Sequence, residues 1–236
     1  GLAAFCAVRL IFFVVRKIEE GQIELGFRHG QTVTACLVAL SHGTNDAQKT
    51  MGIITLTLIA VGFQPSGSGP ELWVVAICGI AIALGTYMGG WRVIRTLGKG
   101  LTEISTPQGF AAEAASATTI LVSSHMGFAL STTQVCSGSI IGSGLGKKGS
   151  KVNWGVAGKM VIAWLVTFPA AGIVGALACA LAKTGLWGTV AVAFIACAVA
   201  FIIWRMSRRN PINSANVNER ADVKVNANPN AKTVAA

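Results

Sequence analysis

The sequence predicts an all-helical membrane protein that crosses the bilayer several times, and three observations lead to this prediction. Hydrophobic residues make up 53% of the 236 residues, charged residues make up only 12%, and the mean hydropathy is +0.62. Soluble domains carry about 25% charged residues, so this composition excludes an ordinary soluble fold, global disorder and a secreted disulfide scaffold. Several apolar runs approach or exceed the roughly 20 residues that a helix needs to cross the hydrocarbon core. These runs are residues 31–63, 72–90, 108–146, 154–182 and 187–204.

A shorter apolar segment, residues 1–15, precedes these runs and is interrupted only by Arg9. No small-residue cleavage site follows it, so it does not have the pattern of a signal peptide. We expect a helix that is cut short, and a chain that is part of a longer protein.

Short basic clusters separate the apolar runs and predict how the chain crosses the membrane. If every cluster is cytoplasmic, the other four runs cross once each, while residues 108–146 enter and leave on one side. That run is therefore predicted to be a re-entrant hairpin with two half-length helical arms. Because the net charge of +10 is divided among the clusters and forms no single stripe, we expect no nucleic-acid binding. The clusters lie within residues 16–28, 92–99, 147–151 and 205–209.

The end of the chain and the cysteines complete this outline. Residues 205–236 are rich in Asn, Ala and charge and lack an apolar face, so we expect a disordered polar tail after a transmembrane part at 1–204. The six cysteines lie one per apolar segment and form no CxxC motif. They are predicted to be small buried hydrophobic residues, with neither disulfides nor a metal site.

The most informative segment lies inside the first long run. Wound as a helix, His42, Asn45, Asp46, Lys49 and Thr50 share one face. An ionised group at mid-bilayer costs several kcal/mol unless it is paired or faces water. This polar stripe must therefore point into a protein interior or a cavity. The alternative is an Asp46–Lys49 ion pair that only fixes helix packing.

A second polar cluster lies in the predicted hairpin. Glu113 sits in the first arm, and Ser131 or Thr132 is a natural N-cap for the second. The free N–H groups of a helix start, with hydroxyls beside them, can bind an anion. Simple capping of the hairpin tip is the alternative. Non-helical backbone at membrane depth is tolerated only where it is buried in protein or lines a cavity, which favours a binding site.

Both clusters resemble the signatures of the inorganic phosphate transporter (PiT) family. Residues 41–49, Ser-His-Gly-Thr-Asn-Asp-Ala-Gln-Lys, resemble its Asn-Asp signature. Residues 109–113, followed by Leu-Ser-Thr-Thr at 130–133, resemble its second signature, a membrane Glu followed by a Ser-Thr-Thr turn. The family carries each signature twice, in two inverted halves, whereas this sequence has one copy of each. The chain therefore resembles the C-terminal half, with a broken helix and a re-entrant hairpin.

This resemblance implies phosphate symport by alternating access in a cell membrane, plasma or inner, and no enzymatic activity. The residues that it places at the substrate are Thr44, Asn45, Asp46, Glu113, Ser131, Thr132 and Thr133. The residues expected at the coupling ion are His42, Asn45, Asp46, Lys49 and Glu113. Sodium-coupled members have Asn or Ser where Lys49 stands, so its ammonium is expected to take the place of a sodium ion. Protons are therefore favoured over sodium, with His42 as an alternative proton relay, since Gln134 replaces the family's His.

The expected partners follow from the same resemblance. They are inorganic phosphate, either free or as a neutral metal–phosphate complex, protons or sodium, the lipid bilayer, the missing N-terminal half of the same protein and a second copy in a homodimer. We expect no cofactor and no resident metal. Carboxylates in an anion site require O–H donors on the substrate or an accompanying cation. Phosphate has such donors at neutral pH and sulfate does not, so the carboxylates are expected to select phosphate.

Two other functions are compatible with parts of the pattern. A passive channel or a non-transporting membrane subunit would need the polar stripe to line a continuous pore. An intramembrane metalloenzyme would use His42 and Asp46 at i, i+4 with a third ligand, either His125 or Glu113. The paired signatures fit alternating access better than a channel.

Overall fold

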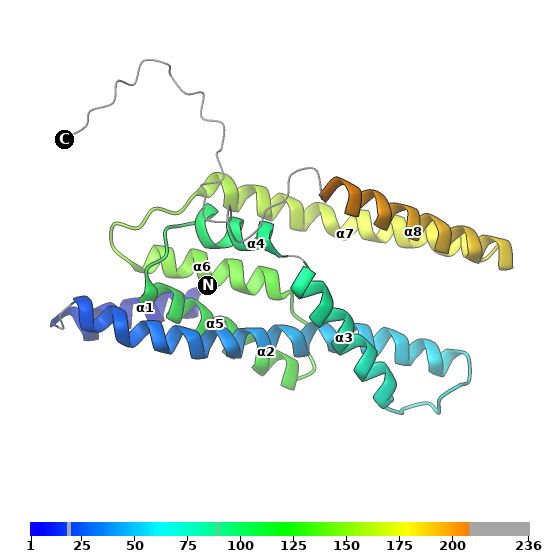
Figure 1. Cartoon of the computed structure of the whole chain (residues 1–236), viewed down its shortest axis with the longest axis horizontal. Coiled ribbons are helices and arrows are strands. Elements are labelled where there is room, and N and C mark those ends of the chain that lie inside the picture. The colour runs from blue at the N-terminus through cyan, green and yellow to red at the C-terminus, as the bar shows by residue number, and fades with distance from the viewer. Residues whose placement is uncertain (18–19, 89, 208–236) are drawn as a thin grey trace, which may run out of the picture. The chain divides into compact units, whose positions relative to one another are not determined.

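The computed structural model describes residues 1–17, 20–88 and 90–207 of the chain, and every regular element within them is a helix (Figure 1). The β-type pairing in that part of the chain is an isolated antiparallel bridge between Thr102 and Val152. The all-helical class predicted from the sequence is confirmed. The elements are α1 (Leu2–Val14), η1 (Val15–Lys17), α2 (Glu20–Ala60), α3 (Leu72–Met88), α4 (Trp91–Arg95), η2 (Thr96–Gly100), α5 (Thr106–His125), α6 (Thr132–Gly146), α7 (Trp154–Ala182) and α8 (Leu186–Ser207).

The described residues form two compact units, 1–152 and 153–207. The second unit is a helical hairpin in which α7 and α8 pack together across a turn at Gly185, where φ is +107°. Both helices are long and apolar enough to cross a membrane, and almost none of their apolar stretches is buried. Their outer surfaces are therefore suited to lipid. The predicted polar tail lies outside the described residues from 208 onward, and α8 continues through its first three positions.

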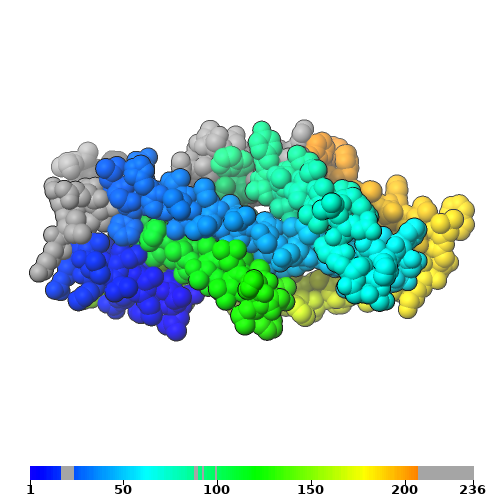
Figure 2. Space-filling model, turned by 90° about the horizontal axis from the view of Figure 1, so that it is seen from below, coloured from blue at the N-terminus to red at the C-terminus, as the bar shows by residue number. Residues whose placement is uncertain are grey.

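The first unit is built on α2, the longest helix. In Figure 2, α5 (green) lies along α2 (blue) and ends well before α2 does. At 1.5 Å per residue, the 41 residues of α2 extend about 60 Å, and the 20 residues of α5 extend about half of that. α6 returns beside α5, and α1 packs against both arms.

The α5–α6 pair has the form of the predicted hairpin. A capping interaction begins α5, because Gln108 Oε1 accepts hydrogen bonds from the backbone N–H and the hydroxyl of Ser105 at 3.0 and 2.8 Å. The amide of the same Gln108 donates to the Ser143 carbonyl near the end of α6, at 3.1 Å. Beyond α6, the Thr102 hydroxyl donates to the Lys151 carbonyl at 3.0 Å. The start of α5 and the end of α6 therefore lie at the same end of the unit.

Small residues let these helices pack closely. A Cβ added to Gly146 would lie 2.9 Å from Val8 Cβ and 3.0 Å from the Phe5 carbonyl oxygen, so α1 touches the backbone of α6. Such contacts are typical of helix pairs in lipid, where apolar burial contributes little to association. The buried residues of α6 are Thr132, Ser137, Ser139, Gly142, Ser143, Gly144 and Gly146.

Two expectations differ from the structure. The Asn-Asp signature does not interrupt α2, which continues through it as an unbroken helix. Its polar side chains find partners without taking a backbone N–H from the helix, since the hydroxyls of Ser41 and Thr44 donate to the carbonyls four residues earlier at 2.5 and 2.8 Å. The cysteines are free, but only Cys78 is buried, while Cys6, Cys36, Cys179 and Cys197 lie on exposed helix faces. Their apolar surroundings are outer surfaces of the helices, which the sequence pattern does not distinguish from a core.

Candidate functional site

The polar stripe of α2 is organised around a single carboxylate, that of Asp46. One oxygen of the Asp46 carboxylate, Oδ1, lies 3.1 Å from Lys49 Nζ, and the other, Oδ2, lies 3.2 Å from His42 Nε2. Asn45 Nδ2 also donates to Asp46 Oδ1, at 3.2 Å. The three ionisable side chains are about one third to one half exposed. Both oxygens of the carboxylate are thus already engaged, while one side of the cluster stays open.

The hairpin tip meets this stripe at a backbone carbonyl. The Leu130 carbonyl accepts a hydrogen bond from Lys49 Nζ at 2.6 Å and another from Asn45 Nδ2 at 2.9 Å. On the other side of the tip, the Ser124 hydroxyl donates to Asn45 Oδ1 at 3.3 Å. Asn45 is 2% exposed, and its side-chain amide bonds to both sides of the tip, at Leu130 and at Ser124. The first signature and the hairpin tip therefore form one cluster.

The hydroxyl-rich start of α6 lies directly after this carbonyl. Ser131 is the N-cap, and its hydroxyl oxygen accepts from the Gln134 N–H at 3.4 Å. Thr132 is buried, whereas Ser131 and Thr133 are exposed. Capping therefore uses the Ser131 hydroxyl, and the neighbouring first-turn N–H groups remain available to an anion.

A small cavity opens between the stripe and the tip. Its volume is about 170 Å³, which is room for several water molecules, since one water needs about 10–15 Å³ of such space. Both an ammonium and an amide face it, so it can hold a small polar solute. The residues that line it are Asn45, Gln48, Lys49, Ser124, Gly127, Phe128 and Ala129.

Glu113 lies at a different level of the unit. Its carboxylate oxygen Oε2 accepts a hydrogen bond from the Thr34 hydroxyl at 2.7 Å, and the side chain of Gln31 is also hydrogen-bonded to it. Thr34 precedes Asn45 by eleven residues of one helix, or about 16 Å. The carboxylate borders a larger cavity of about 560 Å³ with mostly apolar walls from α2, α4, η2, α5 and α6. The structure thus separates Glu113 from the other predicted site residues.

Sequence reasoning missed several groups of these two clusters. The Leu130 carbonyl belongs to the backbone, so no residue type in the sequence marks it. Thr34 and Gln31 lie before the Asn-Asp signature in an otherwise apolar segment. Ser124 belongs to a polar break that is visible in the sequence, but its bond to Asn45 depends on the fold. Among the described residues no three His, Cys, Asp or Glu side chains gather where they could hold a metal, so neither His125 nor Glu113 joins His42 and Asp46 as a metalloenzyme would require.

Comparison with known proteins places these features in a family. The model of the phosphate transporter family matches residues 5–175. The chain belongs to the phosphate transporter family. The family resemblance predicted from the two signatures is confirmed, and members of the phosphate transporter family are membrane proteins that transport and do not catalyse reactions.

Named relatives agree with this assignment. The chain is 54% identical over 212 residues to a "probable low-affinity inorganic phosphate transporter" of Mycobacterium tuberculosis (strain ATCC 25618 / H37Rv), covering 89% of this chain and 51% of the relative. It is 38% identical over 178 residues to a protein of the same name in Bacillus subtilis (strain 168), covering 75% and 53%. The chain thus spans about half the length of these members of the phosphate transporter family.

A solved structure is also similar. The structure titled "The sodium-dependent phosphate transporter" matches with a TM-score of 0.57 and 30% identity, covering 68% of this chain and 42% of that one. About two thirds of this member of the phosphate transporter family therefore shares its helical arrangement with part of that structure.

Proposed function

We propose that this chain forms one half of a phosphate symporter that crosses the plasma or inner membrane several times and works by alternating access. The observation that carries this proposal is the Leu130 carbonyl, to which Asn45 and Lys49 both donate. Those two bonds join the Asn-Asp signature to the hairpin tip. Residues 1–204 supply the transporter half, and the remaining half of the same protein completes the site. A homodimer of the complete protein is part of the same proposal.

Phosphate binds in this proposal where the stripe of α2 meets the start of α6. Lys49 supplies the fixed positive charge, and Ser131, Thr132 and Thr133 supply hydroxyl and backbone donors. The Asp46 carboxylate exchanges its present partners, His42 and Lys49, for the O–H groups of phosphate. Sulfate offers no O–H donor at neutral pH, so its oxygens would face the Asp46 carboxylate without a hydrogen between them. This arrangement costs at least one lost hydrogen bond. Free phosphate and a neutral metal–phosphate complex are both compatible with these donors.

The coupling cation in this proposal is the proton. The Lys49 ammonium lies among oxygens, 2.6 Å from the Leu130 carbonyl and 3.1 Å from Asp46 Oδ1. That is an environment in which a sodium ion would otherwise be stabilised, and the fixed ammonium supplies the same charge. Protons then move through carboxylates and His42, with Glu113 as a separate carboxylate about 16 Å along α2. Sodium coupling is the alternative, because the similar solved structure is named sodium-dependent.

The test is uptake of radiolabelled phosphate by liposomes that contain the complete protein. Sodium and pH gradients are imposed separately. We expect accumulation with an inward proton gradient in the absence of sodium. Accumulation with sodium alone would contradict proton coupling, and equilibration without accumulation would contradict symport. Asp46→Asn and Glu113→Gln should each abolish uptake, while the exposed loop substitution Glu71→Gln should not.

A further inference from the structure

One face of α1 carries a repeating pattern of aromatic and basic side chains. Phe5, Arg9, Phe12 and Arg16 recur at spacings of three and four, so they share a side of the helical path through α1 and η1. The adjoining face packs against the hairpin, with Ala4 and Val8 fully buried. Phe5 and Phe12 are half-buried beside it, while Arg9 and Arg16 are exposed at the surface of the first unit.

The cations of this stripe are held over aromatic rings. The Arg9 guanidinium carbon lies 5.5 Å from the ring centre of Phe5, and that of Arg16 lies 5.0 Å from Phe13. Lys147, at the end of α6, places its ammonium 5.6 Å from the ring centre of Phe12. Each contact contributes about 0.5–1 kcal/mol at an exposed site. The stripe thus combines three positioned cations from two segments of the chain with apolar ring surface between them.

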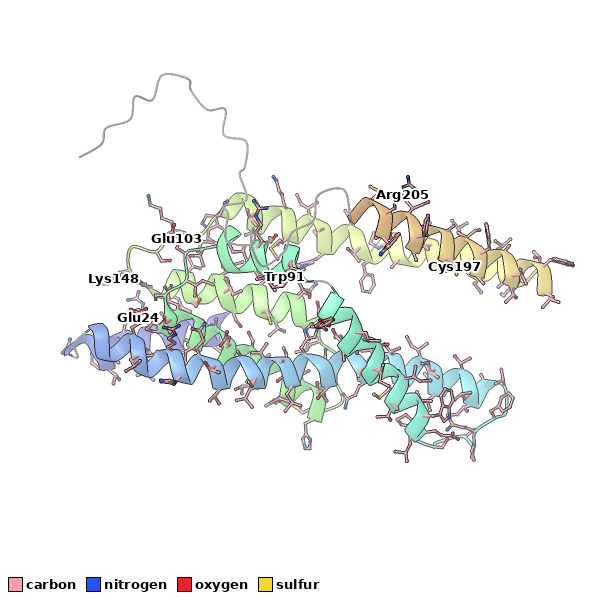
Figure 3. The ribbon with its side chains drawn as sticks, viewed as in Figure 1. Glu24, Trp91, Glu103, Lys148, Cys197 and Arg205 are labelled. Carbon is pink, nitrogen blue, oxygen red and sulfur yellow. The ribbon has the colours of Figure 1, made fainter. Side chains whose placement is uncertain are left out.

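The neighbouring loop strengthens the positive charge at this end. Lys148 and Lys151 follow Lys147, and both are exposed. In Figure 3, Lys148, Glu103 and Glu24 are labelled at the same end of the first unit. Lys147, Lys148 and Lys151 therefore add three cations from one short segment to the two arginines of the stripe.

The length of the stripe is comparable to the thickness of the headgroup layer of a bilayer. Arg9 and Arg16 are seven residues apart on one helical path, or about 10 Å, and the headgroup layer on each side of the hydrocarbon core is about 5–8 Å thick. A long basic side chain can extend its charge towards the headgroups while its stem stays in apolar surroundings. Both arginines can thus reach one headgroup layer, with the rings beside the acyl chains.

We propose that Arg9, Arg16 and Lys147, with the rings of Phe5, Phe12 and Phe13, bind an anionic phospholipid at this end of the membrane-embedded unit. The lipid phosphate and any further headgroup charge pair with the three cations. The first acyl carbons pack on the aromatic rings. This site lies outside the phosphate-transport cluster of α2 and the hairpin tip; it rests on the membrane embedding in the proposed function, and not on phosphate transport itself.

The test is binding of a phosphatidylglycerol with a fluorescent tail to the complete, detergent-solubilised protein, followed by fluorescence anisotropy. Phosphatidylcholine with the same tail is the neutral comparison. We expect phosphatidylglycerol to bind at least tenfold more tightly. Each basic residue near a membrane surface contributes about 1 kcal/mol to binding of anionic lipid, a factor of about five. The triple variant Arg9→Gln, Arg16→Gln, Lys147→Gln should therefore lose about 100-fold in affinity for phosphatidylglycerol.

Two control proteins separate charge from folding. Lys183→Gln, in the exposed turn between α7 and α8, should bind phosphatidylglycerol as the wild type does. The charge-conserving variant Arg9→Lys, Arg16→Lys, Lys147→Arg should retain affinity within a few fold. Equal binding of the two lipids, or loss of binding in the charge-conserving variant as large as in the Gln variant, would overturn the proposal. Displacement of the lipid by millimolar inorganic phosphate would also overturn it, because the stripe would then be a site for free phosphate.

Discussion

Replacement of Lys49 by Asn tests how charge is balanced in the site. In the present structure the ammonium donates to the Leu130 carbonyl at 2.6 Å and pairs with Asp46 Oδ1 at 3.1 Å. A hydrogen bond to a charged group contributes about 1.5–3 kcal/mol. The ion pair adds no more than about 1 kcal/mol, because both side chains are roughly one third exposed. Asn45 keeps its own bond to the same carbonyl, so we take about 2 kcal/mol as the net loss.

Without these contacts the joined arrangement of α2 and the hairpin tip is less stable by about 2 kcal/mol, and phosphate binding must supply that energy, a factor of about 30 in affinity at roughly 1.4 kcal/mol per factor of ten. We therefore expect Lys49→Asn to lower phosphate uptake in sodium-free buffer about 30-fold. Sodium should restore much of this uptake, because Asp46 Oδ1 and the Leu130 carbonyl are left as oxygen ligands without a cation. The assay is uptake by liposomes containing the complete protein, with sodium or choline as the external cation. Lys183→Asn is the matched control, and wild-type uptake by Lys49→Asn in choline would refute the reasoning.

Two further predictions concern stability and the second carboxylate. Thr34→Val removes the 2.7 Å bond to Glu113, so we expect the melting temperature of the complete protein to fall by a few degrees, with a loss of about 1–2 kcal/mol. Thr32→Val, whose exposed hydroxyl bonds only to its own helix, should melt as the wild type does, and equal effects of the two would contradict a special role for this contact. Gly146→Ala places a Cβ 2.9 Å from α1 and should cost about 1–3 kcal/mol, measured by thermal melting. Gly79→Ala, which meets no neighbour within 4 Å, should be neutral or stabilising.

The helical architecture could be predicted from the sequence because hydropathy acts over long segments. The predicted run at residues 154–182 coincides with α7, and the run at 108–146 corresponds to the paired arms α5 and α6. The continuity of α2 could not be read in the same way. A polar segment within an apolar run suggests a break, but Ser41 and Thr44 satisfy their hydroxyls on the preceding turn and leave the helix intact.

The candidate site was only partly predictable for a similar reason. The shared face of His42, Asp46 and Lys49 follows from helical periodicity alone. The contact of this face with the hairpin tip uses the Leu130 carbonyl, and every residue has a carbonyl, so no residue type marks it. Glu113 was expected at the same site, but its partner is Thr34. About three helical turns of α5 separate Glu113 from the hairpin tip, so its side chain meets α2 at Thr34 and not at Asn45.

The central claim is that the α2 signature and the hairpin tip together form one phosphate-binding site. Calorimetric titration of the complete purified protein with phosphate and with sulfate, in the wild type and in Asp46→Asn, tests it most directly. We predict that the wild type binds phosphate and excludes sulfate, and that Asp46→Asn loses at least tenfold in phosphate affinity together with the exclusion of sulfate. Unchanged phosphate affinity and continued exclusion of sulfate in Asp46→Asn would contradict the claim.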